Sequence, residues 1–212
     1  HLLRLTSYFD TFFYYCFAKI IMGRAEIFLE TKMSKIKKCC FTGHRPQSLP
    51  FVIEEEGESR EGLKQKIKEE IEKLINNDDI RYFISGMALG VDMLAAELII
   101  ELKKKYPDIE LEAAIPCEVQ YIKWSAAQKQ RYFNILLKCD RKNILQKNYS
   151  PKCMLRRNRY MVDASDIVLA VWNGEAGGTG STVKYAEKQN KRIITIDPSK
   201  YFIPVNLEIK QI

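Results

Sequence analysis

The sequence predicts an α/β protein with a Rossmann-like, doubly wound and mainly parallel sheet that carries helices on both faces. Three observations lead to this prediction. Short apolar segments recur along the chain, segments with helical spacing separate them, and glycine-containing turns follow three of the apolar segments. Strands that alternate with helices indicate βαβ units, which build a parallel sheet covered on both sides.

Six strands are expected, each a short and largely apolar segment: 36–42, 80–84, 109–115, 143–146, 166–172 and 192–197. Five helices are expected between them: 60–76, 89–105, 121–138, 152–164 and 181–190. The first helix is the clearest, because apolar residues from Leu63 to Leu74 recur at helical spacing while lysine and glutamate occupy the other face. No repeat or long linker divides 33–212, so we expect one Rossmann-like domain there.

Residues 1–32 differ in composition from the rest of the chain. Seven aromatic residues crowd positions 8–17, and charged residues interrupt the surrounding apolar stretch. The uncharged run 11–18 is far shorter than the roughly 20 residues that span a bilayer, and no clear cleavage site marks a signal peptide. Met33 is a cleaner start. We expect 1–32 to be an atypical extension that results from a mis-set start. The alternative is a disordered arm, or one that binds a membrane surface or a partner.

Composition excludes several classes of protein. The 212 residues are 46% hydrophobic and 29% charged, the balance of a globular chain. The six cysteines form no C-x-x-C pair and the only histidines are His1 and His44, so no metal site is predicted. Scattered cysteines without an export signal fit a cytoplasmic protein. The net charge of +7 is spread along the chain, so nucleic acid is a less favoured partner.

The turn after the first strand is the first candidate for a binding site. In open α/β sheets a ligand lies outside the carboxyl ends of the strands. The segment 42–46 reads Thr-Gly-His-Arg-Pro. Gly43 permits close backbone approach, His44 donates or accepts a proton near neutral pH, and Arg45 offers a planar fork to an anion. We expect these three residues to bind the ligand, the alternative being a solvent-exposed turn.

The second candidate, 85–92, follows the second strand and opens a helix. Ser85, Gly86 and Gly90 would shape a turn whose exposed N–H groups hold a phosphate or another anion. The dinucleotide fingerprint G-x-G-x-x-G is absent. Asp92 lies in the first turn of the helix, where it either complements the helix dipole or binds ribose hydroxyls.

The third candidate, 174–182, follows the fifth strand. Gly177 and Gly178 belong to a run of four glycines in seven residues, followed by the hydroxyls of Thr179, Ser181 and Thr182. Backbone N–H groups at a helix start, reinforced by the helix dipole, form an oxyanion cradle. The lysine of a P-loop is absent, so a magnesium-dependent NTPase is not indicated.

Three further side chains are weaker candidates. Arg156 and Arg159 lie one helical turn apart and would clamp phosphates together, although a solvated basic face is an equal alternative. Trp172 closes the fifth strand and would stack on a base, although large aromatic residues there are more often part of the core.

The motifs at 40–46, 85–92, 171–174 and 177–179, taken in order, resemble the SLOG superfamily, and within it the YpsA-like branch of bacterial proteins of unknown function. The resemblance extends from about Lys35 to Pro198. It implies a Rossmann-like domain that binds nucleotides or nucleotide-derived molecules between its glycine turns. It does not imply an established activity.

Two related families offer competing functions. The turn 85–92 and the Arg-Asn-Arg segment 157–159 resemble DprA, which implies single-stranded DNA binding. The loop 177–181 loosely resembles the Pro-Gly-Gly-x-Gly-Thr-x-x-Glu motif of LOG phosphoribohydrolases. Lys184 stands at the place of the motif's glutamate, which weighs against N-glycosidic hydrolysis because such chemistry needs a carboxylate.

The favoured expectation is therefore a nucleotide-binding sensor or regulator. The glycine loops would hold the phosphate, Arg45 and Arg159 would neutralise it, and the ligand would be a nucleotide such as ADP-ribose or NAD. No cofactor is required, and a homo-oligomer remains open because no interface is evident. A nucleotide-processing hydrolase is the first alternative, and a DprA-like protein that binds single-stranded DNA is the second.

Overall fold

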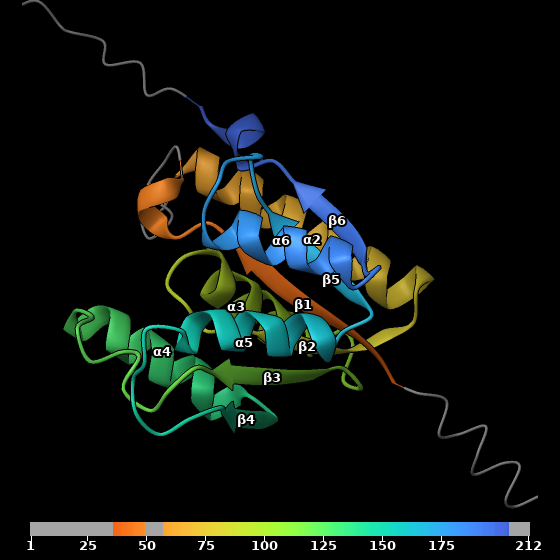
Figure 1. The fold of residues 1–212 in the computed structure, drawn as a ribbon. Coiled ribbons are helices and arrows are strands. Elements are labelled where there is room, and N and C mark those ends of the chain that lie inside the picture. Colours follow the sequence, from red (N-terminus) through yellow and green to blue (C-terminus); the bar gives the residue numbers. More distant parts are fainter. Residues whose placement is uncertain (1–35, 50–56, 204–212) are drawn as a thin grey trace, which may run out of the picture. The chain divides into compact units, whose positions relative to one another are not determined.

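Six parallel strands form one sheet within residues 36–49 and 57–203, the part of the chain that the computed structural model describes. They are β1 (Lys37–Gly43), β2 (Ile80–Ser85), β3 (Glu110–Ile115), β4 (Arg141–Ile144), β5 (Ile167–Val171) and β6 (Arg192–Ile196). Their order is β4-β3-β2-β1-β5-β6 (Figure 1). The predicted Rossmann-like α/β fold is confirmed, with a sheet that is entirely parallel. The expected extension 1–32 lies outside the described residues.

Five α-helices connect the strands in this part of the chain: α2 (Glu58–Asn77), α3 (Val91–Leu102), α4 (Ala126–Lys138), α5 (Cys153–Asp163) and α6 (Gly178–Lys188). Two 3-10 turns, η2 (Pro46–Ser48) and η3 (Pro198–Tyr201), complete the elements. Among these described helices, none has the length and apolar character that crossing a bilayer requires.

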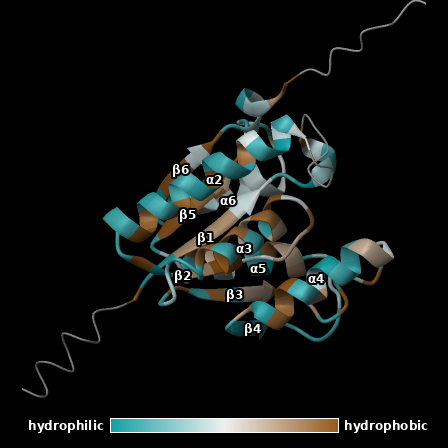
Figure 2. Cartoon of the chain, turned by 180° about the vertical axis from the view of Figure 1, so that it is seen from behind, coloured by the Kyte–Doolittle hydropathy of each residue, from teal (hydrophilic) through white to brown (hydrophobic). Residues whose placement is uncertain are grey.

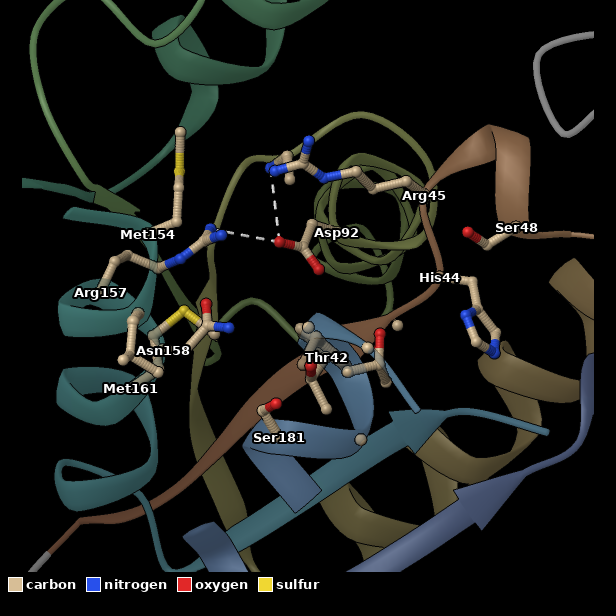
Figure 3. A pocket seen from close by; sticks show the side chains of 18 of the residues that line it. Thr42, His44, Arg45, Ser48, Asp92, Met154, Arg157, Asn158, Met161 and Ser181 are labelled. Carbon is tan, nitrogen blue, oxygen red and sulfur yellow. Dashed lines mark hydrogen bonds and ion pairs between the residues drawn. The ribbon is translucent and has the colours of Figure 1, made fainter. Parts of the chain in front are cut away.

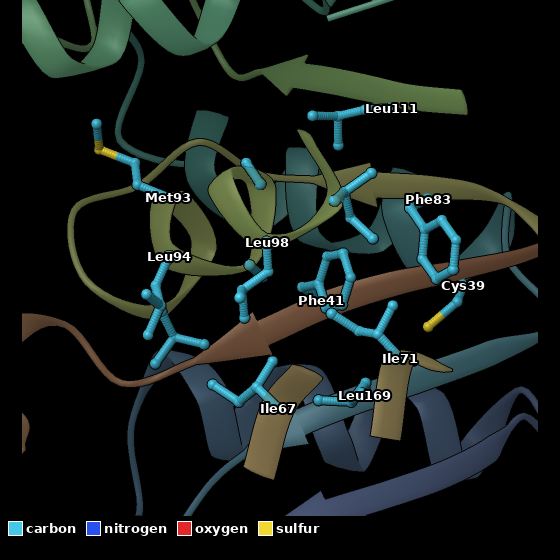
Figure 4. Packing of buried hydrophobic residues seen from close by; sticks show 14 of the residues in the cluster. Cys39, Phe41, Ile67, Ile71, Phe83, Met93, Leu94, Leu98, Leu111 and Leu169 are labelled. Atoms are coloured by element: carbon cyan, nitrogen blue, oxygen red, sulfur yellow. The ribbon is translucent and has the colours of Figure 1, made fainter. Parts of the chain in front are cut away.

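The helices cover both faces of the sheet, with α2, α3 and α4 on one face and α5 and α6 on the other. Successive side chains of a strand point to opposite faces, and β1 shows this clearly. Phe41 stacks on Phe83 at 5.9 Å between ring centres, beside Ile67 of α2 (Figure 4). Cys40 packs on the opposite face with Met161 of α5. Hydrophilic and hydrophobic residues alternate along the ribbons of α2 and α4 (Figure 2).

The chain reverses its direction of travel across the sheet at β1. From β1 it builds outward through β2 and β3 to β4, and α5 then returns it to β5, on the other side of β1. Cys40 is in register with Ile84 of β2, and Gly43 with Val171 of β5. Such a switch point leaves a crevice at the carboxyl ends of the two diverging strands, which is the usual ligand site of doubly wound sheets.

The observed helix starts differ from the predicted ones for local reasons. The helix expected from residue 121 begins at Ala126, because Ser125 and Gln128 form a capping box in which each side chain accepts the other's backbone N–H. The helix expected from residue 89 begins at Val91, after Gly90 with a φ of 94°. The last helix begins three residues earlier than predicted, within the glycine run.

Candidate functional site

A cavity of about 400 Å³ opens at the carboxyl ends of β1 and β5 (Figure 3). Four segments wall it: the end of β1 with the turn that follows, the turn into α3, one face of α5, and the loop that leads into α6. The predicted site residues that line it are Gly43, His44, Arg45, Asp92, Gly177, Gly178, Thr179 and Ser181. Three of the predicted segments, separated by large distances in the sequence, therefore meet at the switch point.

His44 ties the end of β1 to the end of β5. Its Nε2 lies 2.8 Å from Oδ1 of Asn173, and its backbone N–H donates to the carbonyl of Val171 at 3.3 Å. Its carbonyl accepts the N–H of Val91 at 3.4 Å. The side chain is buried rather than solvent-exposed. His44 thus holds three of the loops around the cavity together, besides lining it.

Ser85 and Gly90 of the turn after β2 position Asp92, whereas Ala88 of the same turn lines the cavity. Oγ of Ser85 donates to the carbonyl of Asp92 at 2.8 Å and accepts the N–H of Met87 at 3.1 Å. Gly90 sits so close to β1 that a Cβ there would lie 2.7 Å from the carbonyl oxygen of His44. Ser85 and Gly90 therefore fix the shape of the turn, and neither of them lines the cavity.

A buried ion pair crosses the cavity floor. Nη1 of Arg157 lies 3.3 Å from Oδ2 of Asp92, with the two residues only 4% and 6% exposed. Burial raises the pKa of the Asp92 carboxyl, and the charges of Arg157 and Arg45 oppose that rise. Figure 3 shows the guanidinium groups of both arginines directed toward the carboxylate of Asp92. A guanidinium stays protonated in proteins, so this part of the cavity keeps its positive charge.

Gly86 makes room for this arrangement. Nη1 of Arg157 also donates to the carbonyl of Gly86, and a Cβ at this position would lie only 1.7 Å from Nη1. The glycine therefore leaves the space through which Arg157 passes, and it does not itself line the cavity. Nε of Arg157 is buried and has no hydrogen-bond partner in the part of the chain that the structure describes.

The first turn of α6 presents its backbone to the cavity. Gly177 is the N-cap, and no side chain among the described residues caps the helix. Residues 177–181 line the cavity together with Glu175 and Ala176. The hydroxyl of Thr182 points elsewhere, since it donates to the carbonyl of Gly178 and accepts from Asn158 Nδ2, both at 2.8 Å.

Six of the predicted site residues do not line the cavity: Ser85, Gly86, Gly90, Arg159, Trp172 and Thr182. Nε1 of Trp172 donates to the carbonyl of Glu175 at 2.7 Å and so braces the loop before α6. The guanidinium of Arg159 lies over the ring of Tyr185, 5.4 Å from its centre. The expected clamp of Arg156 and Arg159 is not seen, because Arg156 donates to Gln146 instead.

Arg157 and Asn158 line the cavity although the sequence analysis did not select them. Residues two apart on an α-helix point about 200° apart, so Arg157 turns inward where Arg159 turns outward. The sequence does hold a signal for this. Cys153, Arg157 and Met161 are spaced by four residues, and the two apolar members are buried. An arginine within such an apolar stripe is the one that faces the protein interior.

Side-chain chemistry limits what the cavity does. The carboxylates among its described lining residues are Asp92, engaged with Arg157, and Glu175 on the loop before α6. Lys184, which stands at the place of the glutamate of the phosphoribohydrolase motif, is exposed on α6 and does not line the cavity, and the same holds for Glu187 three residues further along. Within the described ranges no cluster of histidine, cysteine and carboxylate side chains is arranged to hold a metal ion.

Comparison with known proteins matches residues 39–201 to the family described as the YspA SLOG family. The uncharacterized SPbeta prophage-derived protein YoqJ of Bacillus subtilis is 36% identical over 138 residues, which cover 59% of this chain and 81% of YoqJ. A UPF0398 protein of Bacillus thuringiensis is 26% identical over 160 residues, covering 74% of this chain and 86% of that protein.

Two solved structures of DNA processing protein A share the fold. The protein from Streptococcus pneumoniae matches with a TM-score of 0.53 and 15% identity over 77% of this chain, and this chain spans about half of that protein's length (51%). The protein from Helicobacter pylori, whose structure concerns its binding of single-stranded DNA, matches with a TM-score of 0.51 and 20% identity, covering 81% of this chain and 67% of that one.

Proposed function

This chain belongs to the YspA SLOG family, and from that premise we propose that it binds a nucleotide or nucleotide-derived small molecule in the cavity at β1 and β5. In this proposal the protein acts as a sensor or regulator rather than as an enzyme. The phosphate of the ligand sits against the first turn of α6, and its ribose lies beside Asp92 in the same cavity.

One observation carries the proposal: the uncapped start of α6 and the guanidinium groups of Arg45 and Arg157 line the same cavity. The first N–H groups of a helix have no partner within the helix, and the helix dipole adds partial positive charge there. A phosphate satisfies these donors and is further attracted by the two arginines. The buried Nε of Arg157 fits this interpretation, since an unsatisfied buried donor in a folded protein calls for a bound ion or water.

Asp92 supports a sugar-bearing ligand. Its Oδ2 is held by Arg157 and by the backbone N–H of Ala88 at 3.4 Å. Its second oxygen points away from the two arginines (Figure 3), and in this proposal it accepts a ribose hydroxyl. Both roles considered for Asp92, ordering the turn and contacting ribose, are therefore compatible.

The two alternative functions receive less support. Hydrolysis of an N-glycosidic bond needs a carboxylate free to stabilise the reacting centre, whereas Asp92 is paired with Arg157 and Glu175 lies on a loop. Binding of single-stranded DNA is suggested by the shared fold of the two DNA processing proteins. Such binding uses a basic groove that continues along the strand. Its affinity falls steeply as the salt concentration rises.

Gly178 offers a direct test, because a Cβ at this position would meet no atom within 4 Å. The change Gly178→Leu fills the cradle without disturbing the fold. In the intact chain, a saturating nucleotide such as AMP or ADP-ribose should raise the apparent unfolding free energy by about 2.7 kcal/mol at a hundredfold excess over Kd. Gly178→Leu should abolish that rise.

Gly57, the N-cap of α2, provides the matched control, since a Cβ there also meets no atom within 4 Å. Gly57→Leu should bind like the parent chain. Unchanged nucleotide affinity in a folded Gly178→Leu variant refutes the cradle. Release of a free base from the nucleotide favours the hydrolase, and a response to single-stranded DNA alone, falling steeply with salt, favours DNA binding.

A further inference from the structure

A second cavity, of about 550 Å³, adjoins the first on the side of the turn into α3. Arg45, Ala88 and Met154 line both cavities, so these residues form the wall that the two have in common. The remaining walls come from Gln47, Leu89, the segment 119–124 after β3, and Tyr149. The two cavities are therefore neighbouring compartments at the same edge of the sheet.

The second cavity differs from the first in its chemistry. Its walls are largely apolar and aromatic, with Leu89, Val119, Ile122, Trp124 and Tyr149. Ile122 and Tyr149 are 61% and 63% exposed. Exposed apolar side chains gathered around a concavity indicate a binding site, because a ligand that covers them removes apolar surface from water, which is favourable.

The aromatic wall is held in place before any ligand arrives. The ring of Trp124 packs edge to face against Tyr132, with 5.4 Å between ring centres and 89° between planes. Nε2 of Gln120 donates to the carbonyl of Met87 at 3.2 Å, which ties the segment after β3 to the turn that carries Asp92. This hydrogen bond links the walls of the two compartments.

Charge in the second cavity also favours an anionic ligand. Arg45 lies at the junction with the first cavity and Lys123 lies in the second, while the described residues that line this second cavity include no carboxylate. A phosphate linkage passing from one compartment to the other would run beside Arg45. A planar ring beyond it would meet the side chains of Trp124 and Tyr149.

We propose that this second cavity is a subsite for an aromatic ring, and that the ligand is a dinucleotide, two nucleosides joined through their phosphates. The proposal rests on the proposed function, since the phosphates are held at α6 and Arg45. Phosphates anchored at one place suit the site better than a DNA strand does, because the uncapped backbone donors gather at the start of α6 and because Asp92 and Glu175 line the first cavity.

The experiment compares two probes that carry the same pyrophosphate, diadenosine diphosphate and ADP-ribose, of which only the first has a second base. Calorimetric titration of the intact chain should show diadenosine diphosphate binding about tenfold more tightly, the usual effect of stacking one base. Tyr149→Ala and Ile122→Ala should remove this difference and leave ADP-ribose affinity unchanged. Leu137→Ala, an exposed apolar position of α4 outside both cavities, is the matched control and should change neither.

Fluorescence gives an independent readout, because the chain has only two tryptophans. In a Trp172→Phe variant the emission comes from Trp124 alone. Diadenosine diphosphate should quench it, whereas ADP-ribose should not. Quenching by both probes to the same extent would contradict the assignment of the second cavity to the second base.

The outcomes separate the two proposals. Equal affinities of the parent chain for both probes, each abolished by Gly178→Leu, overturn the second subsite and leave the first site intact. Failure of both probes to bind overturns both proposals. Tighter binding of an oligothymidylate strand, weakened by Tyr149→Ala, assigns the aromatic cavity to single-stranded DNA and overturns the dinucleotide.

Discussion

Arg157 and Asp92 are 65 positions apart in the sequence and form a buried ion pair, with 3.3 Å between Nη1 and Oδ2. The pair joins α5 to the start of α3, two helices that cover opposite faces of the sheet. It therefore sets the distance between two walls of the cavity. The stability of the fold and the shape of the site depend on the same contact.

The first prediction concerns that pair. Asp92→Asn leaves the guanidinium of Arg157 buried without a countercharge, and we expect the free energy of unfolding to fall by about 3–5 kcal/mol in urea denaturation. Arg157→Met alone should also destabilise the fold, whereas the double variant Asp92→Asn/Arg157→Met removes both charges and should lose much less than Asp92→Asn and Arg157→Met combined. Losses that simply add would show that the two side chains are not coupled.

Gly86→Ala should break the same contact from the backbone side. The new Cβ would lie 1.7 Å from Nη1 of Arg157 and 2.6 Å from Oδ2 of Asp92, so the guanidinium must leave its place. We expect a loss of about 1–3 kcal/mol in unfolding free energy. Gly57→Ala, where the Cβ meets nothing within 4 Å, should stay within about 0.5 kcal/mol of the parent. Equal effects at the two glycines would contradict the steric argument.

Asp140 should contribute to the loss of stability in acid. Burial by itself would raise the pKa of its carboxyl, but the N–H of Leu111, at 2.6 Å, and the ammonium of Lys103 together lower it below the ordinary value of 3.8. A lowered pKa means that the stabilisation is present above that ordinary value and is lost as the pH falls through the folded value. The side chain is 37% exposed, so screening keeps the effect under about 1 kcal/mol.

The corresponding measurement is unfolding free energy between neutral pH and acid for Asp140→Asn and the parent chain. The variant should start slightly less stable and decline less steeply as the pH falls. Parallel curves would show that Asp140 has the same pKa in the folded and unfolded chains.

Glu112 is the buried acceptor for two tyrosines. The hydroxyl of Tyr82 donates to Oε2 at 2.6 Å, and that of Tyr160 donates to Oε1 at 2.7 Å. Burial, with the hydrogen bond to Glu112, raises the pKa of Tyr160 to about 12. Glu112→Leu removes the acceptor of both hydroxyls and should cost about 1–3 kcal/mol for each one. Adding Tyr82→Phe and Tyr160→Phe should restore part of the loss, and an unchanged deficit would refute the account.

Local patterns in the sequence were sufficient for most of the fold. The spacing of Leu63, Ile67 and Ile71 marks a helix whose apolar face lies in the core, and all three are fully buried. The same reasoning placed α4 too early, because the capping box at Ser125 starts the helix where the apolar pattern alone does not. Element type follows from periodicity, whereas element ends depend on individual capping contacts.

The candidate site was predictable only in part. The turns after β1, β2 and β5 were expected to meet, since parallel strands bring their carboxyl ends to one edge. Which side chains of those turns reach the cavity was not predictable in the same way. Ser85, predicted to shape its turn, donates to the carbonyl of Asp92, and Trp172, predicted either to stack on a base or to belong to the core, donates to the carbonyl of Glu175.

The sequence by itself determined the order of strands and helices, the parallel α/β class and the segments at the edge of the sheet, because these depend on periodicity and turn chemistry within short stretches. Only the tertiary structure decided that Arg157 enters the site while Arg159 lies on Tyr185, and that a second, aromatic cavity adjoins the first. Those facts depend on how α5 is rotated against the sheet and on where the segment after β3 packs. Such packing is set by contacts between residues far apart in the chain, so the periodicity of α5 marks Arg157 as the inward arginine without showing which cavity it enters.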